Sequence, residues 1–280
     1  MKNFLLIGLF TLITISSCEL IEDASDELNQ ANIAAGLKEA LKVGTDTATS
    51  KLAITDGYFK DAAVKILLPT DLQNQIADFK AFEINLFGLG TVTGEQIYNS
   101  GIPALGINSL KSKEDDLILG INRAAETAAS EAGPIFFSAI TDITIADAEG
   151  ILRGSDSAAT NYLRGKTFDA LFLSFEPKIN SAINNVKIGE LSVEERFANF
   201  AVEYNKILNT SVPTGLISTA TVGELANLNT IAQPDISTFA TDRGLKGLFI
   251  KIKEEEKNIR ENPLARVTEL LKEVFGLLDK

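Results

Sequence analysis

The chain has 280 residues, enough for one large domain or two small ones, and 45% of them are hydrophobic, which is enough for a substantial core. Its formal net charge of −12 at pH 7 predicts repulsion from nucleic acid, so we expect no nucleic-acid partner. The absence of histidine and the single cysteine exclude histidine-dependent nucleophile systems, intrachain disulfides and metal sites built on imidazole or thiolate groups. No glycine-rich phosphate-binding motif occurs, and we expect no cofactor and no metal.

The N-terminal residues have the pattern of a secretory signal. Lys2 precedes an apolar run, residues 4–15, that is too short to cross a bilayer as a permanent helix. The run ends in Ile15-Ser16-Ser17-Cys18, which resembles the bacterial lipobox, where a signal peptidase cuts before a cysteine that is then lipidated. We therefore expect residues 1–17 to be a lipoprotein signal peptide and Cys18 to carry the acyl groups. An ordinary signal peptide that ends near a cysteine is the alternative.

This N-terminus also predicts where the protein is located. Cleavage before Cys18 would remove Lys2 and change the formal net charge from −12 to −13. Several acyl chains hold a protein durably on a bilayer, at about 0.8 kcal/mol for each buried methylene. Glu19 rather than aspartate follows the cysteine, which under enterobacterial sorting rules permits transport to the outer membrane. We expect a protein that is lipid-anchored in the bacterial cell envelope, in the outer membrane.

Apolar residues recur at helical spacing along the first part of the body. One helix is expected to end near Gly44 and a second to end at the turn signal Asp56-Gly57. Thr70 and Gln73 predict a capping box that opens a third helix. The apolar positions that share one face of these helices are Ile33, Leu37 and Leu41, then Ala48 and Leu52, then Leu72, Ile76 and Phe79.

The segment 121–167 combines small residues, phenylalanine and spaced charges, and predicts three consecutive helices. Gly133-Pro134 is expected to separate the first from the second, since glycine suits a helix end and proline a helix start. Thr144 with Asp147 resembles a capping box, and Gly154 is expected to end the helix that follows. Ser155 or Asp156 is then expected to cap the third helix.

Helical patterns continue to the C-terminus. Pro177 is expected to end or kink an apolar helix at Glu176, and Ser192 with Glu195 forms a full capping box. Glu256 lies four residues before Arg260, which predicts an exposed ion pair. Asn262-Pro263 is expected to cap a last helix whose apolar stripe runs from Leu264 to Phe275.

Two glycine-rich intervals interrupt this pattern, residues 87–110 and 211–230. Residues 91–93 are expected to be extended, and short helices are expected at residues 95–99 and 224–229. Loops of this length inside a compact domain are usually functional or mobile. The fold class predicted is all-α, a multi-helix array or bundle with two Gly-rich loop insertions and little or no sheet. Residues 18–32 are expected to be an acidic tether, and residues 33–280 a single helical domain.

Several sequence blocks resemble one bacterial family. They are Gly36-Leu37-Lys38-Glu39-Ala40-Leu41, Leu68-Pro69, Asn122-Arg123-Ala124-Ala125-Glu126, Asp147-Ala148 to Gly154, Ala158-Ala159-Thr160-Asn161-Tyr162, Phe175-Glu176-Pro177, Thr241-Asp242-Arg243-Gly244-Leu245, and residues 254–266. The chain is similar in these blocks to an envelope lipoprotein family catalogued as a domain of unknown function, number forty-one ninety-seven. The resemblance spans about residues 33–276, and both glycine-rich intervals look longer than in the family pattern. It implies fold and location and adds no chemistry.

Four polar residues of the central segment form a candidate ligand or ion-pair site. Arg123 and Glu126 are three positions apart, so they can pair along one helix face, or Arg123 can instead hold a ligand carboxylate or phosphate. Asn122 adjoins them, and Asp142 could face Glu126 as the second acid of a glycoside-cleaving pair. The acids near Asp142 lack EF-hand spacing, and helix capping accounts for them without a metal.

Six aromatic side chains form a candidate apolar pocket. They are most simply core, and the alternative is a pocket between helices for a lipid or another envelope hydrophobe. The residues are Phe136, Phe137, Tyr162, Phe168, Phe172 and Phe175.

Two classes of function follow from these patterns. The first is a non-enzymatic lipoprotein that binds an envelope protein or an apolar ligand. The second is a carboxylate-based hydrolase that acts on cell-wall or glycan material. A connected apolar pocket would favour the first class, and two facing carboxylates in a cleft would favour the second. We expect the first class and identify no catalytic residue.

Overall fold

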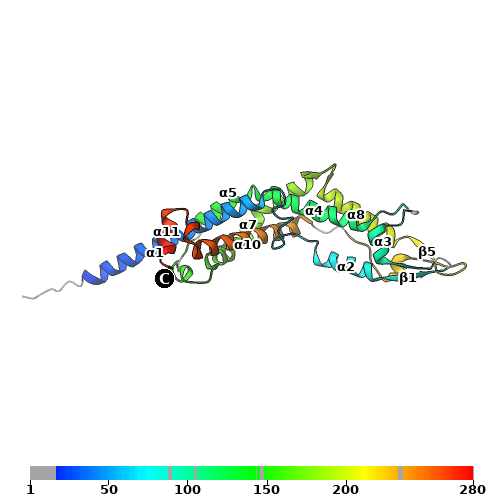
Figure 1. The fold of residues 1–280 in the computed structure, drawn as a ribbon, viewed down its shortest axis with the longest axis horizontal. Coiled ribbons are helices and arrows are strands. Elements are labelled where there is room, and N and C mark those ends of the chain that lie inside the picture. Colours follow the sequence, from blue (N-terminus) through cyan, green and yellow to red (C-terminus); the bar gives the residue numbers. More distant parts are fainter. Residues whose placement is uncertain are drawn as a thin grey trace, which may run out of the picture.

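The computed structural model of the chain describes residues 17–87, 90–103, 106–142, 144–145, 148–232 and 236–279, and side chains from Gln30 onward. Within these residues it is an elongated array of eleven α-helices with three two-stranded antiparallel sheets (Figure 1). The all-α prediction is confirmed. The predicted signal peptide lies outside the described residues, apart from Ser17.

The first helix, α1, runs without a break over Ser17–Leu52. The predicted helix end near Gly44 is therefore wrong. Gly44 lies where α1 meets α10 (Ile236–Glu261), because a Cβ at Gly44 would lie 3.5 Å from the carbonyl oxygen of Ile252. A Cβ at that distance would make ordinary van der Waals contact, and α1 continues through Gly44 because a single glycine weakens a helix without ending it. The acidic segment 18–32 is helical and continuous with the body, and Ile33 is the first buried residue among the described side chains.

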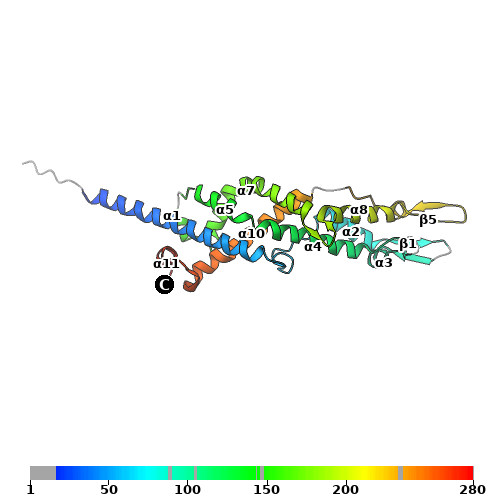
Figure 2. The same ribbon diagram turned by 90° about the horizontal axis from the view of Figure 1, so that it is seen from above.

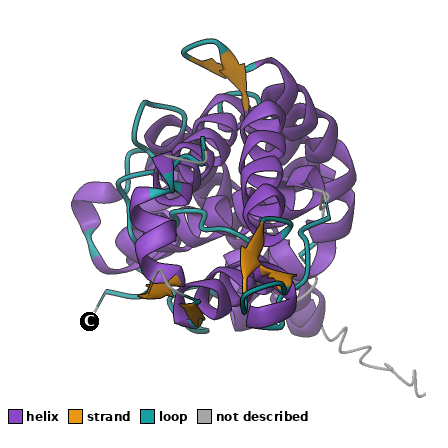
Figure 3. Cartoon of the chain, turned by 90° about the vertical axis from the view of Figure 1, so that its right-hand side faces the viewer, coloured by secondary structure: helices purple, strands orange, loops and turns teal. Residues whose placement is uncertain are grey.

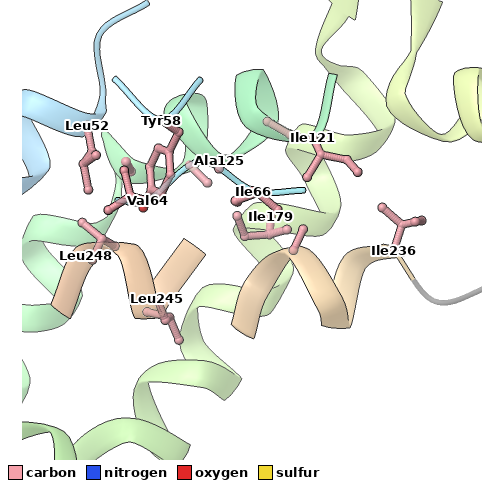
Figure 4. Close-up of a cluster of buried hydrophobic side chains, with 14 of the residues drawn as sticks. Leu52, Tyr58, Val64, Ile66, Ile121, Ala125, Ile179, Ile236, Leu245 and Leu248 are labelled. Carbon is pink, nitrogen blue, oxygen red and sulfur yellow. The ribbon is translucent and has the colours of Figure 1, made fainter. Parts of the chain in front are cut away.

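Four further helices pack against α1 and one another to form the body (Figure 2). They are α4 (Leu110–Ala129), α5 (Ala132–Asp142), α7 (Ala158–Asn185) and α10. The short α6 (Ala148–Leu152) joins α5 to α7. Side chains from α1, α4, α7, α10 and the turns after α1 meet in one hydrophobic cluster (Figure 4). This cluster is the centre of the core.

One predicted helix boundary in the body is wrong, and of the two alternatives predicted at Pro177, a helix end or a kink, the helix end is excluded. The break between α4 and α5 falls at Ser130 and Glu131, so Gly133-Pro134 lies in the first turn of α5. Pro177 lies inside α7 and does not end it. Proline removes the N–H that would bond the carbonyl of Leu173. Both residues are on the exposed side of α7, so water can hydrate that carbonyl.

Two predicted capping boxes had different outcomes. Helix α2 (Thr70–Ala81) begins after Pro69 without a side-chain cap, and the amide of Gln73 donates to the carbonyl of Leu68, so the first box is wrong. Helix α8 (Val193–Leu208) has the predicted box: Ser192 accepts from the N–H of Glu195, and Glu195 accepts from the N–H of Ser192. The proline N-cap leaves no hydroxyl to satisfy the α2 amides.

Both glycine-rich intervals contain a β-hairpin followed by a short helix. The first consists of β1 (Glu83–Leu86), β2 (Gly90–Thr93) and α3 (Gly94–Ser100), and the second of β5 (Ser211–Pro213), β6 (Thr219–Thr221) and α9 (Val222–Ala226). The predicted extended residues 91–93 and the helix at 95–99 are confirmed, whereas the second short helix begins earlier than predicted. A third hairpin, β3 (Lys187–Ile188) with β4 (Leu191–Ser192), precedes α8.

The hairpins β1–β2 and β5–β6, here called the distal hairpins, lie together at one end of the molecule, and the start of α1 lies at the other (Figures 1 and 2). An end-on view shows the strands as small additions to the helical array (Figure 3). The chain therefore has a long axis with its described N-terminal residues at one end and its sheet-forming intervals at the other.

The C-terminal segment departs from the single helix predicted. A 3₁₀ turn, η2 (Pro263–Ala265), precedes a short α11 (Glu269–Gly276) that starts afresh at the N-cap Thr268. Leu264 is 91% exposed and Val267 is 67% exposed, so the predicted apolar stripe is wrong over its first turn. Leu271, Val274 and Phe275 are buried, and α11 packs on α1.

Candidate functional site

The predicted polar residues of α4 hold the turn-rich segment that follows α1. Asn122 is fully buried, and its side-chain amide accepts from the N–H of Ile66 at 2.9 Å and donates to the carbonyl of Ile66 at 2.7 Å. One carboxylate oxygen of Glu126 accepts from the backbone N–H groups of Tyr58 and Phe59, both at 3.1 Å. These bonds satisfy backbone polar groups of the irregular segment after α1 with side chains of one helix, α4.

Arg123 completes this cluster by bridging two carboxylates. Its guanidinium lies 2.6 Å from the second oxygen of Glu126 and 2.7 Å from Asp56. Asp56 has φ 71°, a left-handed conformation that aspartate tolerates better than most residues. Hydrogen bonds from Lys60 and then Arg123 hold the pKa of the Asp56 carboxyl below its usual range. The i,i+3 ion pair is present, and each carboxylate in it already has partners within the chain.

Asp142 does not join this cluster. It is the exposed last residue of α5, and no hydrogen bond or ion pair of the described residues links it to Arg123 or Glu126. Asp147, the other acid considered for capping, lies outside the described residues. The described part of the chain also contains no group of three or more acidic or cysteine side chains arranged to hold a metal ion.

A second polar cluster lies at the C-terminal end of α10 and contains the ion pair of Glu256 and Arg260. The prediction that this pair is exposed is wrong. Glu256 is 1% exposed and Arg260 is 7% exposed, with 2.7 Å between their charged atoms. Glu256 accepts from the backbone N–H groups of Ala159 and Thr160, in the first turn of α7. The predicted caps for this helix, Ser155 and Asp156, are wrong, because Glu256 supplies the acceptor from another helix.

Arg260 serves the neighbouring helix end in the same way. It donates to the carbonyls of Leu152 at 2.6 Å and Ile151 at 3.2 Å, at the C-terminus of α6. Arg266, also buried, donates to the last carbonyls of α10 and pairs with Asp279. One run of sequence thus caps three helix ends with charged side chains, which places its charges where the helix dipoles favour them.

The six predicted aromatic residues belong to the core or pack against it. Phe136 and Phe175 are buried, and the rings of Phe136 and Phe168 lie 5.3 and 6.0 Å from the ring of Phe249 on α10. The partly buried members, Phe137, Tyr162, Phe168 and Phe172, pack against the same core. The hydroxyl of Tyr162 donates to the carbonyl of Thr144. Their positions correspond to the simpler of the two interpretations, core packing.

An apolar cavity of about 370 Å³ lies instead between the distal hairpins and the helices at their bases. This distal cavity has ten apolar lining residues, eight of them isoleucine or valine, and two polar ones, Thr210 and Ser211. Its volume lies within the range of about 300–1,000 Å³ that small-molecule sites occupy. The lining residues are Phe82, Ile84, Val92, Ile97, Ile102, Ile107, Ile207, Thr210, Ser211, Val212, Pro213 and Val222.

Both hairpins contribute side chains to the wall of the distal cavity. Ile84 and Val92 are cross-strand partners in β1–β2, so their side chains share the face that lines it. Val212 lines it from β5. The N–H of Phe87 donates to the carbonyl of Pro213 at 3.3 Å and joins the end of one hairpin to the other. Both contributions therefore come from two-stranded structures.

Sequence reasoning flagged both glycine-rich intervals but did not identify these lining residues. A usable signal was present, because β-branched residues concentrate in these intervals at Thr91-Val92-Thr93 and again around Val212 and Val222. Such enrichment is typical of strands, whereas the glycine content of the same intervals alone indicates loops.

A model of the family described as Protein of unknown function (DUF4197) matches residues 27–86 and 102–276 of the chain. The unmatched residues 87–101 include β2 and α3, so Val92 and Ile97 of the cavity lining fall outside the matched segments. The interval 211–230 lies within the match. No curated protein and no solved structure matches the chain. None of the helices in the described ranges has the length and apolar character that a membrane crossing requires.

Proposed function

We propose that this chain, which belongs to the family described as Protein of unknown function (DUF4197), is a lipid-anchored envelope protein that binds an apolar ligand in the distal cavity. The observation that carries the proposal is the contrast between the cavity's size and its lining. A space of about 370 Å³ walled by aliphatic side chains offers water almost no hydrogen-bonding partner. A hydrocarbon-like ligand gains in this space the dispersion contacts that water cannot make.

The chemistry of the lining narrows the class of ligand. Ten of its twelve residues are apolar and none is ionisable, so the buried part of the ligand carries no charge. Ser211 provides a hydroxyl group at the β5 side, where one polar group of the ligand can bond, and the Thr210 hydroxyl, which donates to the carbonyl of Lys206, can still accept. An acyl chain or a small terpenoid has this character. The hydrolase alternative gains no support from the cavity, because its lining contains no carboxylate.

The anchor is the second part of the proposal and is supported by the sequence alone. The motif that ends in Cys18 predicts cleavage and acylation, and Cys18 lies in the first turn of α1. A Cys18→Ala variant should leave the membrane fraction and appear in the soluble fraction of the cells that make it. Retention of the variant in membranes after a high-salt wash would contradict the anchor and leave the cavity proposal untouched.

The ligand proposal is tested by extraction. Protein purified from its native envelope in mild detergent is extracted with organic solvent, and the extract is analysed by mass spectrometry. We expect an apolar molecule at a constant ratio to protein. Val212→Phe, which places a ring in the cavity, should reduce that ratio at least about tenfold. Val202→Phe, at an exposed position of α8 outside the lining, is the matched control and should retain the molecule.

Two results of the extraction would contradict the ligand proposal. One is that the wild-type protein yields no apolar molecule above the amount found with the detergent alone. The other is that Val212→Phe and Val202→Phe retain equal amounts. Val92→Phe fills the cavity from the other hairpin and serves as a second variant where Val212→Phe unfolds, as judged by its circular dichroism melt.

A further inference from the structure

The tip of the β5–β6 hairpin presents two large aliphatic side chains to solvent. Thr214 and Ser218 close the loop, with the N–H of Thr214 donating to the carbonyl of Ser218 at 3.0 Å. Between them, Leu216 is 88% exposed and Ile217 is fully exposed. Phe87, at the turn of the neighbouring hairpin, is half exposed. Exposed apolar groups gathered at one projection are typical of a surface that contacts a membrane or a partner.

The charge pattern distinguishes a lipid surface from a typical protein partner. Charged residues make up 23% of the chain, yet residues 84–94 and 207–223 contain none. Partial burial in a bilayer requires such a segment, because each charge carried into the hydrocarbon region costs about 2.5 kcal/mol or more. The rim of a protein interface, by contrast, is polar and usually carries charges.

The position of the tip agrees with the same interpretation. The distal hairpins project from the end of the long axis opposite the start of α1, so no other part of the described chain covers them (Figures 1 and 2). The strands that carry these tips also wall the distal cavity. The exposed apolar side chains and the apolar cavity thus belong to the same two hairpins.

We infer that the tips of the distal hairpins, Leu216 and Ile217 with Phe87, insert into the surface of an electrically neutral lipid bilayer. The acidic body is repelled by anionic lipid, so a zwitterionic surface is the better match. The contact itself goes beyond the proposed function and does not depend on it. Only the identity of the bilayer rests on the proposed anchor: with Cys18 at the opposite end, the tips contact a second membrane.

The absence of tryptophan from the chain provides a direct test. Ile217→Trp in the full chain introduces a single fluorophore at the tip. The matched control is Leu173→Trp, at an exposed aliphatic position within α7 of the helical body. Each variant is mixed with vesicles of phosphatidylcholine, with and without brominated acyl chains that quench tryptophan. Circular dichroism verifies that both variants keep the helical content of the wild type.

We expect the emission of Ile217→Trp to shift to shorter wavelength and to be quenched about twofold or more by brominated chains, as for a side chain at the headgroup–acyl boundary. Leu173→Trp should show neither change. Replacing a third of the lipid with phosphatidylglycerol should weaken the effect. Absence of quenching at Ile217→Trp, or equal quenching of both variants, would overturn the inference. Neither result bears on ligand content, so failure here is distinguishable from failure of the cavity proposal.

Discussion

The helical body and the distal hairpin end differ in what they bury. In the body, buried charges such as Glu256, Arg260 and Glu126 each find partners on other elements, most of them backbone groups at helix ends or turns. At the distal end the interior surface is aliphatic and encloses a space that no side chain fills. The buried charges of the body have partners within the chain, whereas the distal cavity is the space that we propose a ligand fills.

This difference is the reason that we propose the ligand site at the distal end. The family resemblance and the spacing of charges both include residues 122–126 of α4 and residues 254–266. The polar side chains of these two blocks cap helix ends and hold turns in place. A residue whose bonds are all made within the chain has little left to offer a ligand. The distal cavity lies in the intervals with weak helical pattern. Substitutions in the body and at the C-terminal segment test this contrast.

The largest effect is expected at the buried ion pair. Arg260→Ala leaves Glu256 buried without its charge partner and removes the side-chain donor of the Leu152 carbonyl. The free energy of unfolding should fall by about 3–5 kcal/mol. Arg153→Ala removes one member of an exposed i,i+4 pair with Glu149, and should cost less than about 1 kcal/mol. Urea unfolding measures both, and equal losses would contradict the account of the body.

The C-terminal segment provides a matched pair of leucines. Leu271 is fully buried against α1, and Leu264, seven residues earlier, is 91% exposed. Leu271→Ala should therefore cost about 2–5 kcal/mol. Leu264→Ala should change stability by less than about 0.5 kcal/mol. A large loss at Leu264 would mean that this side chain is covered in solution and that η2 is itself a contact surface.

A moderate effect is expected in the α4 cluster. Arg123 is about a quarter exposed, so Arg123→Ala should cost about 2 kcal/mol, less than Arg260→Ala, by leaving the buried Glu126 without its ion pair. Glu126→Gln should also destabilise the protein, because the N–H groups of Tyr58 and Phe59 lose a charged acceptor. The melting temperatures of both variants and the wild type measure these losses. Unchanged or raised stability in both variants would indicate that the cluster is kept for a ligand.

The smallest effect is expected in the dependence of stability on pH, through the ion pair of Arg266 and Asp279. The hydrogen bond from Arg266 lowers the pKa of Asp279 below its usual value of 3.8. The contribution of this pair to stability is therefore fully present above about pH 4 and is lost as the pH falls through the lowered, folded-state pKa. When the pH is lowered from 5 to below this pKa, Asp279→Asn should lose less stability than the wild type loses. The melting temperature of each protein across that range measures the difference, and parallel curves would contradict it.

Much of the fold could be predicted from the sequence, because helix formation depends on local spacing. The apolar faces of α2, α8 and α10 and the Ser192 capping box follow directly from residues three and four apart. The burial of Glu256 was also visible in principle, since it lies four residues after Ile252 on the apolar face of α10. A charged residue is nevertheless expected to be exposed when no partner is apparent. The partners of Glu256 are backbone groups of another helix, and no local sequence pattern marks such a contact.

The candidate site was less predictable for a physical reason. The lining of the distal cavity comes from elements separated by more than a hundred residues, between Phe82 and Val222. Whether their side chains meet or leave a space depends on the distance between two hairpins, which no local pattern encodes. The aromatic residues proposed as a pocket are numerous enough to line one, but they fill the space between α5, α7 and α10.

The most direct test of the central claim is a binding titration of the distal cavity with Nile red, a neutral apolar dye that fluoresces when it leaves water. The protein is first stripped of any bound molecule, and wild type, Val212→Phe and Val202→Phe are titrated in turn. We predict saturable binding of one dye per chain to wild type and Val202→Phe, with affinity at least about tenfold weaker in Val212→Phe. Equal binding by all three proteins, or no saturable binding by the wild type, would contradict the claim that this cavity is the ligand site.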